Sequence, residues 1–386
     1  MTWPAGAWPT ARAAGNADVV ILGDSITSGQ AATSYWDRSY AARLRTSIRA
    51  LYGDGGSGFS PHWTGAAGGG AYTVTGTSGS VFAAYVPNGH AATFSGAARW
   101  THQAEGTEVA VYLRRVPTYG TARWRVDSGP WQTGINCDGT TGYIRVSATN
   151  LDPGTHTIDV EATSGTVAVA GTEGRNTTGS RVHIMGLGAR TSGGNAFSSP
   201  TFEANAAFRA ASIGRWAPHL LIINLGVNDS NTATINAATY KTNVEAMITT
   251  ARAARSDCDL VLVANALGKF DDNAYDGMRQ SLYELAFSHG GKVVDVDFTS
   301  RIGFDRSYPW PADPQDWLDA MQVDPYAETV SHPSASLLVR TDTDPTGTAW
   351  GEWAWRGFYA NGSDSVHPGD TGHHILAHIL NQVVSL

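Results

Sequence analysis

The sequence predicts an α/β protein whose parallel sheet carries helices on both faces and whose chain is interrupted by an antiparallel β-sandwich. Continuous apolar strands alternate with helical segments at the start of the chain and again after residue 181, which is typical of a buried parallel sheet. Between residues 71 and 181, short β-rich segments are separated by Gly, Pro, Asn and Asp at roughly 8–15-residue spacing, as in an antiparallel sandwich.

The first α/β segment begins with an apolar strand at residues 18–22, which ends at Gly23. Apolar residues then recur at helical spacing from Tyr40 to Leu51 and predict a helix behind this strand. Residues 53–70 form a glycine-rich connector to the β-rich segment. In that segment we expect strands at residues 72–75, 81–85, 109–113, 122–126, 143–146, 157–161 and 167–170.

A second α/β segment follows the β-rich stretch. Because that stretch is about 110 residues long and therefore domain-sized, the sequence predicts two domains. One domain would comprise residues 1–55 and 182–386, and the inserted sandwich residues 71–181. The expected strands are 182–187, 219–225, 259–264 and 292–296, and the expected helices are 203–216, 239–255, 274–288 and 371–384. The tryptophan-rich stretch 298–360 is long for a loop, which favours a lid or a binding edge.

Composition excludes several classes of protein. Apolar residue types make up 42% of the chain and charged types 16%, so a folded protein is expected. The net charge of -8 argues against a nucleic-acid-binding protein, which would carry a basic face. No apolar run approaches the ~18 residues of a membrane-spanning helix.

The N-terminus lacks the basic and apolar regions of a signal peptide. We therefore expect the protein to act where it is made, in the cytoplasm, or to leave by another route, for example within a virion; a processed or recombinant start is the third alternative. Cys137 and Cys258 lie in different predicted domains, so two buried free thiols are expected. No cysteine spacing typical of a zinc site occurs.

Gly23-Asp24-Ser25 follows the first strand directly and leads toward the first helix. Ligand sites in open α/β sheets lie at the carboxyl ends of strands, so Ser25 stands where a nucleophile is expected. The alternative is that Ser25 only caps the following helix.

Asp364 and His367 lie just before the last predicted helix. A carboxylate three residues before a histidine can accept the Nδ1 proton and leave Nε2 facing a nucleophile. The alternative is a turn that starts at Asp364, with His367 on the surface. The histidines at 373, 374 and 378 are predicted to be packed or solvated rather than metal-binding, because no carboxylate stands at ligand spacing.

Two further loops follow strands of the predicted sheet. Asn228 comes just after the strand at 219–225, where its amide can donate to an oxyanion. Gly193 and Gly194 follow the strand at 182–187, where glycine lets a backbone N–H approach a reacting atom closely. The alternative for Asn228 is an Asn-Asp helix cap or turn, and the alternative for the two glycines is a simple flexible loop.

Along the chain the four motifs come in the order Ser25, Gly193-Gly194, Asn228 and Asp364 with His367, and in that order they resemble the blocks of the SGNH hydrolases of the GDSL esterase/lipase superfamily. The resemblance covers residues 1–55 and 182–386; its second block fits Gly193 or Gly194, of which Gly194 is preferred. It implies a flavodoxin-like three-layer α/β sandwich and a catalytic triad of Ser25, Asp364 and His367. It also implies an oxyanion hole made by Ser25, one of the two glycines and Asn228, with no metal and no organic cofactor.

The resemblance leaves the acyl group and the alcohol open. Residues 151–157 and 164–167 make the inserted domain similar to the jelly-roll, carbohydrate-binding modules that accompany carbohydrate esterases. We therefore expect O-deacetylation of a polysaccharide or a cell-surface glycan, with Trp310, Trp353 and Trp355 as candidate sugar contacts. The alternatives are a lipid or aryl esterase, or a non-catalytic glycan-binding protein, such as a phage tail protein, on a hydrolase scaffold.

Overall fold

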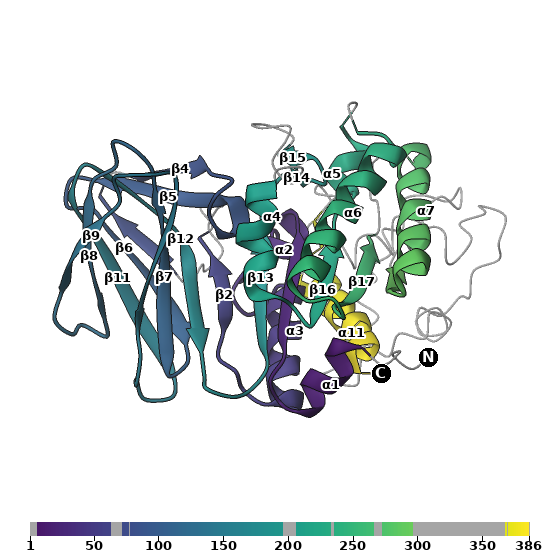
Figure 1. Cartoon of the computed structure of the whole chain (residues 1–386), viewed down its shortest axis with the longest axis horizontal. Helices are drawn as coiled ribbons and strands as arrows, with labels where there is room; N and C mark the ends of the chain where they lie inside the picture. Colours follow the sequence, from purple (N-terminus) through teal and green to yellow (C-terminus); the bar gives the residue numbers. More distant parts are fainter. Residues whose placement is uncertain are drawn as a thin grey trace, which may run out of the picture.

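The structure is a computed structural model in which residues 6–62, 72–76, 78–195, 206–232, 235–265, 272–295, 367–368 and 370–385 are described. Figure 1 shows the antiparallel strands on one side of the molecule and the parallel sheet with its helices on the other. The mixed α/β composition, with one parallel sheet and separate antiparallel sheets, confirms the predicted class at this level.

The parallel sheet has five strands in the order β13-β1-β16-β17-β18. Along the chain this is the order 2-1-3-4-5, as in doubly wound flavodoxin-like sheets. Ligands bind such sheets at the point where the strand order reverses, here between β1 and β16 at their carboxyl ends. The strands are β1 (Asp18–Gly23), β13 (Arg181–Gly186), β16 (Leu220–Asn224), β17 (Asp259–Ala264) and β18 (Lys292–Asp295).

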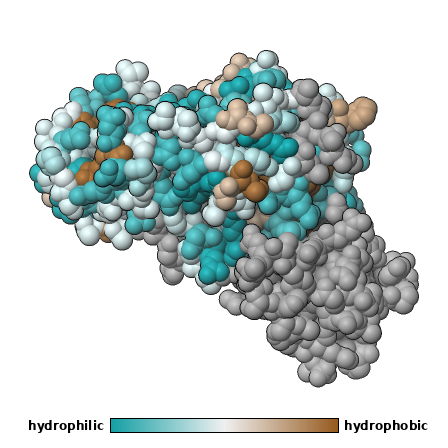
Figure 2. All heavy atoms as spheres, turned by 90° about the horizontal axis from the view of Figure 1, so that it is seen from below, coloured by the Kyte–Doolittle hydropathy of each residue, from teal (hydrophilic) through white to brown (hydrophobic). Residues whose placement is uncertain are grey.

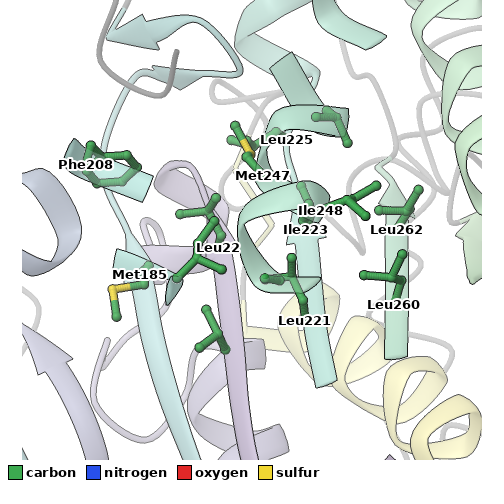
Figure 3. Packing of buried hydrophobic residues seen from close by; sticks show 14 of the residues in the cluster. Leu22, Met185, Phe208, Leu221, Ile223, Leu225, Met247, Ile248, Leu260 and Leu262 are labelled. Atoms are coloured by element: carbon green, nitrogen blue, oxygen red, sulfur yellow. The ribbon is translucent and has the colours of Figure 1, made fainter. Parts of the chain in front are cut away.

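Helices cover both faces of this sheet because its strands bury alternate side chains on opposite sides. Val19 and Ile21 pack toward α1 (Ala7–Ala13), α3 (Tyr40–Tyr52) and α11 (Asp370–Ser385). Val20 and Leu22 pack on the other face, toward α4 (Ala206–Ser212), α6 (Ala237–Ala254) and α7 (Asp272–His289). Figure 3 shows this second face, where Met247 of α6 lies over the apolar side chains of the strands.

The antiparallel strands form two sheets in the orders β10-β7-β12-β5-β4 and β3-β6-β11-β8-β9, with β2 (Gly58–Pro61) paired to β12. Side chains of both sheets share one core that includes Trp100, Leu113 and Trp124, so the sheets pack face to face. The strands are β3 (Tyr72–Thr75), β4 (Ser78–Phe82), β5 (His90–Ser95), β6 (Arg99–Glu105), β7 (Glu108–Arg115), β8 (Thr121–Val126), β9 (Gln132–Asn136), β10 (Gly142–Ala148), β11 (Thr155–Ser164) and β12 (Thr166–Arg175).

Several element boundaries differ from those predicted. The strand expected at 81–85 is observed three residues earlier, as β4 (Ser78–Phe82), because the chain then turns into the short helix η1 (Pro87–Gly89). The helix expected at 203–216 ends at Ser212 within the described residues and continues as η2 (Gly214–Trp216), since glycine weakens a helix interior. The strand expected at 292–296 is described only to Asp295.

Contacts join the antiparallel strands to the parallel sheet. Phe59 of β2 and Tyr112 of β7 belong to the same apolar core as Met185 of β13. Trp216 also joins this core, and its indole nitrogen donates to Glu173 Oε1 at 3.1 Å. The two regions are therefore packed together and not connected by the chain alone.

The cysteine prediction is confirmed, since Cys137 and Cys258 are both free and buried. Among the helices in the described part of the chain, none combines the length and the hydropathy needed to cross a bilayer.

Candidate active site

Ser25 lies at a sharp turn between β1 and the short helix α2 (Ser25–Ser28). The turn requires glycine at position 23, because a Cβ there would lie 1.9 Å from Thr27 Oγ1. Asp24 caps α2, and its Oδ1 accepts a hydrogen bond from the Ile26 backbone at 2.9 Å. The predicted capping role therefore belongs to Asp24, which leaves the Ser25 hydroxyl available for chemistry.

The Oγ of Ser25 lies 2.8 Å from Nε2 of His367. The serine is 4% exposed, so this contact is shielded from most of the solvent. A neutral imidazole at this distance can accept the hydroxyl proton. The predicted third member, Asp364, lies outside the described residues, as do Trp310, Trp353 and Trp355.

A buried polar network contacts α2, the short helix that begins at Ser25. The Tyr40 hydroxyl lies 2.6 Å from Thr27 Oγ1 of α2 and accepts from Asn224 Nδ2 at 3.0 Å. His373 packs on the Tyr40 ring, and its Nδ1 accepts from the Tyr40 backbone N–H at 3.3 Å. His373 thus has a packing role.

Asn228 follows the carboxyl end of β16, in the short helix α5 (Val227–Ser230). The bend before it uses Gly226 at a φ of 124°, which disfavours any residue with a side chain. Asn228 Nδ2 donates to the Arg190 carbonyl at 3.0 Å and lies 3.4 Å from Asp24 Oδ2. The amide is therefore held beside the segment that carries Ser25.

The glycine loop is the turn of a small hairpin between β14 (Arg190–Thr191) and β15 (Gly194–Asn195). Ser192, just before Gly193, donates its backbone N–H to Asp229 Oδ1 at 2.7 Å. This bond ties the loop after β13 to the residue next to Asn228. The loops carrying the predicted oxyanion donors therefore meet at the edge of the sheet where β1 ends.

Two carboxyl groups, Asp24 and Asp229, are completely buried at this edge. The pKa of Asp24 is raised to about 7, chiefly by burial; the hydrogen bond from the Ile26 backbone opposes this rise, and the neighbouring charge of Asp229 adds to it. Burial also raises the pKa of Asp229 to about 6. Within the described residues, Oδ2 of Asp229 has no hydrogen-bond partner.

Arg190 is a further residue beside this site, and no motif in the sequence indicated it. Its side chain is completely buried, and its guanidinium donates to backbone carbonyls from distant parts of the chain. The one signal in the sequence is an arginine immediately before the small-residue loop at 191–194. No group of metal-binding side chains occurs in the part of the chain that the structure covers.

No family model and no curated protein sequence matches the chain. A solved structure described as a peptidoglycan O-acetylesterase is similar to it, with a TM-score of 0.57 and 14% sequence identity. The similarity covers 99% of this chain and 95% of that chain. The two proteins therefore share a fold over nearly their whole lengths.

Two carbohydrate esterases of family two are also similar. One, from Cellvibrio japonicus, has a TM-score of 0.27 and 11% identity, over 61% of this chain and 89% of that chain. The other, from Corynascus thermopiles, carries a carbohydrate-binding domain and has a TM-score of 0.32 and 12% identity, over 80% and 98%. TM-scores of this size do not establish a shared fold.

Proposed function

We propose that the protein is a serine esterase of the SGNH type, with Ser25 as the nucleophile and His367 as the general base. The observation that carries this proposal is the 2.8 Å contact between Ser25 Oγ and His367 Nε2 at the carboxyl end of β1. A hydroxyl and an imidazole in hydrogen-bond contact are the minimal parts of an activated nucleophile.

The reaction is an acyl transfer in two steps. His367 takes the Ser25 proton as Oγ attacks the ester carbonyl, and it returns that proton to the departing alcohol. Water, activated by the same imidazole, then attacks the acyl-enzyme and releases the acid and the free Ser25 hydroxyl. Asp364 is proposed to accept the Nδ1 proton of His367 and to stabilise the imidazolium.

The oxyanion is proposed to bind the backbone N–H of Ser25, that of Gly193 or Gly194, and the Asn228 amide. The meeting of the loops after β1, β13 and β16 supports this arrangement. In the absence of substrate, Asn228 Nδ2 donates to the Arg190 carbonyl and to Asp24 Oδ2, so one amide hydrogen must redirect or be shared as the oxyanion forms.

The proposed substrate is an O-acetylated polysaccharide or cell-surface glycan. The support is the fold shared with the peptidoglycan O-acetylesterase, together with the surface character of the molecule. In the view of Figure 2 the surface over the described residues is mostly teal to white, from hydrophilic to intermediate, with small, scattered hydrophobic spots. A polar glycan suits such a surface better than a lipid does.

The antiparallel region, residues 71–181, is proposed to be an inserted jelly-roll domain that binds carbohydrate. A groove of about 430 Å³ lies between β9 and β10, the edge strands of the two sheets. Its lining has no charged side chain: Trp124, Gln132, Thr133, Gly134, Ile135, Asn136, Ile144, Val146 and Ser147. Amides and hydroxyls beside an apolar floor suit an uncharged sugar.

The test is hydrolysis of p-nitrophenyl acetate and of O-acetylated peptidoglycan by the wild type, Ser25→Ala and the control Ser80→Ala, whose serine is exposed on β4. Activity in the wild type and control that is lost in Ser25→Ala is the expected result. Equal activity in all three would mean that another residue is the nucleophile. Glycan binding without hydrolysis by any variant would support a non-catalytic binding protein instead.

A further inference from the structure

Arg190 occupies a completely buried position between the end of β1, the end of β13 and the turn η1 of the antiparallel region. Its Nη1 donates to the carbonyls of Gly23, at 3.0 Å, and Met185, at 2.6 Å. Its Nη2 donates to the carbonyl of Asn88 at 2.6 Å and lies 3.3 Å from Asn88 Oδ1. One guanidinium therefore joins two strands of the parallel sheet to the antiparallel region.

The main chain of the same residue reaches the predicted oxyanion hole. Its carbonyl accepts from Asn228 Nδ2 at 3.0 Å. The strand end that Arg190 holds, Gly23, lies two residues before Ser25. Arg190 thus contacts the segment that carries the nucleophile and the side chain that is predicted to bind the oxyanion.

The partner of Arg190 in the antiparallel region is a constrained turn. Asn88 is completely buried and has a φ of 63°, a left-handed conformation that Asn and Gly adopt more readily than other residues. Because this conformation presents the Asn88 carbonyl to the guanidinium, a residue that avoids positive φ would displace the carbonyl. A planar guanidinium has fixed donor directions and follows such a displacement poorly.

We infer that Arg190 is a positioning residue that couples the η1 turn of the antiparallel region to the geometry of Ser25 and Asn228. This inference rests on the proposed esterase function. A buried guanidinium bound to several carbonyls is costly to move without losing bonds. Displacing the η1 turn is therefore expected to shift Gly23 and the Arg190 carbonyl together, and with them the nucleophile and the oxyanion donor.

The experiment compares Asn88→Val, which disfavours the left-handed turn, with Asn88→Gly, which preserves it and keeps the backbone carbonyl. The matched control is Asn150→Val, because Asn150 also has a positive φ, 59°, and lies exposed at another turn of the antiparallel region. The measurements are kcat and KM for p-nitrophenyl acetate and the rate of Ser25 labelling by a fluorophosphonate. Thermal unfolding checks that each variant is folded.

Asn88→Val is expected to lower kcat and the labelling rate by about 10- to 100-fold while KM changes little, since small misplacements of reacting groups have effects of this size. Asn88→Gly is expected to recover most of this loss, and Asn150→Val to keep the wild-type kcat. If Asn88→Val does not fold, Arg190→Lys replaces it, because one ammonium group cannot reach the same set of carbonyls.

A folded Asn88→Val with wild-type kcat and labelling rate would overturn the inference and leave the esterase function intact. The same applies if Asn150→Val loses as much kcat as Asn88→Val, because strain in the antiparallel region alone would then explain the effect. A wild type that neither hydrolyses the ester nor reacts with the fluorophosphonate would overturn the esterase function itself, and the inference with it.

Discussion

His367 Nε2 lies 2.8 Å from Ser25 Oγ, although 342 residues separate the two in the sequence. In the proposed mechanism this imidazole accepts the Ser25 proton, so its removal should abolish activation of the nucleophile. We predict that His367→Ala lowers kcat for p-nitrophenyl acetate by about 10³-fold or more, with little change in KM. The control His378→Ala, on α11 and in contact with Gln382, should keep its activity. Substantial activity in His367→Ala would assign the general base elsewhere.

Asn228→Ala tests the proposed oxyanion hole. If the amide stabilises charge that develops in the transition state, this variant should lower kcat by about 10²–10³-fold and change KM much less. The control is Asn231→Ala, because Asn231 is exposed at the end of the same short helix. An increase in KM with an unchanged kcat would instead indicate that Asn228 contacts the ground-state substrate.

Asp24→Asn tests the electrostatics beside the nucleophile through the pH dependence of stability. Burial raises the pKa of Asp24 from 3.8 to about 7, so between these pH values the folded wild type holds a proton that the unfolded chain has released. The free energy of unfolding of the wild type should therefore fall as pH rises through this window. The amide of Asp24→Asn does not titrate, and Asn also caps helices well.

We accordingly expect Asp24→Asn to gain stability relative to the wild type by at least about 1 kcal/mol as pH rises from about 4 to about 7. Urea unfolding at several pH values measures this difference. A difference that is constant across the window would show that the Asp24 carboxyl titrates normally in the folded protein.

The groove between β9 and β10 is tested by placing a large charged side chain in it. Ser147→Arg is expected to weaken binding of a soluble, uncharged, O-acetylated oligosaccharide fragment at least about fivefold, because it fills the groove and brings a charge to an uncharged lining. Isothermal titration calorimetry measures the affinity, and Ser80→Arg on exposed β4 is the control. Hydrolysis of p-nitrophenyl acetate by Ser147→Arg should be unchanged. Equal fragment affinities in both variants would place glycan binding elsewhere.

The sequence predicts the parallel sheet well because its strands are continuous apolar runs. The strand expected at 219–225 is observed as β16, Leu220–Asn224, and the expected helix from Tyr40 is observed as α3. Strands β5, β6 and β9 were not predicted, since His90–Ser95, Arg99–Glu105 and Gln132–Asn136 have few β-branched residues and no clear apolar run. Strand β2 lies in a glycine-rich connector that resembles a loop.

Motifs could propose Ser25, His367 and Asn228 as site residues because each motif is local in sequence. The role of Arg190 could not be predicted in this way, because Gly23 and Asn88, its partners, are 167 and 102 residues away in the chain. No local pattern encodes a contact that exists only after the antiparallel region packs against the parallel sheet. The roles of all the predicted site residues stay predictions, and Asp364, Trp310, Trp353 and Trp355 also lie outside the described residues.

The pairing of β1 with β13 has a consequence for how the protein is made. Their first paired residues, Asp18 and Arg181, are 163 positions apart, so β1 leaves the ribosome long before either of its neighbours in the sheet exists. Strands β2 to β12, which make up the two larger antiparallel sheets, are all synthesised during that interval, and domains tend to fold as units during synthesis. Folding of the antiparallel region would bring the ends of this long loop together and lower the entropic cost of closing the sheet. Until that region has folded, strands this far apart in the sequence pair slowly. We therefore expect slow refolding of the full chain from denaturant, limited by the step that joins β1 to β13.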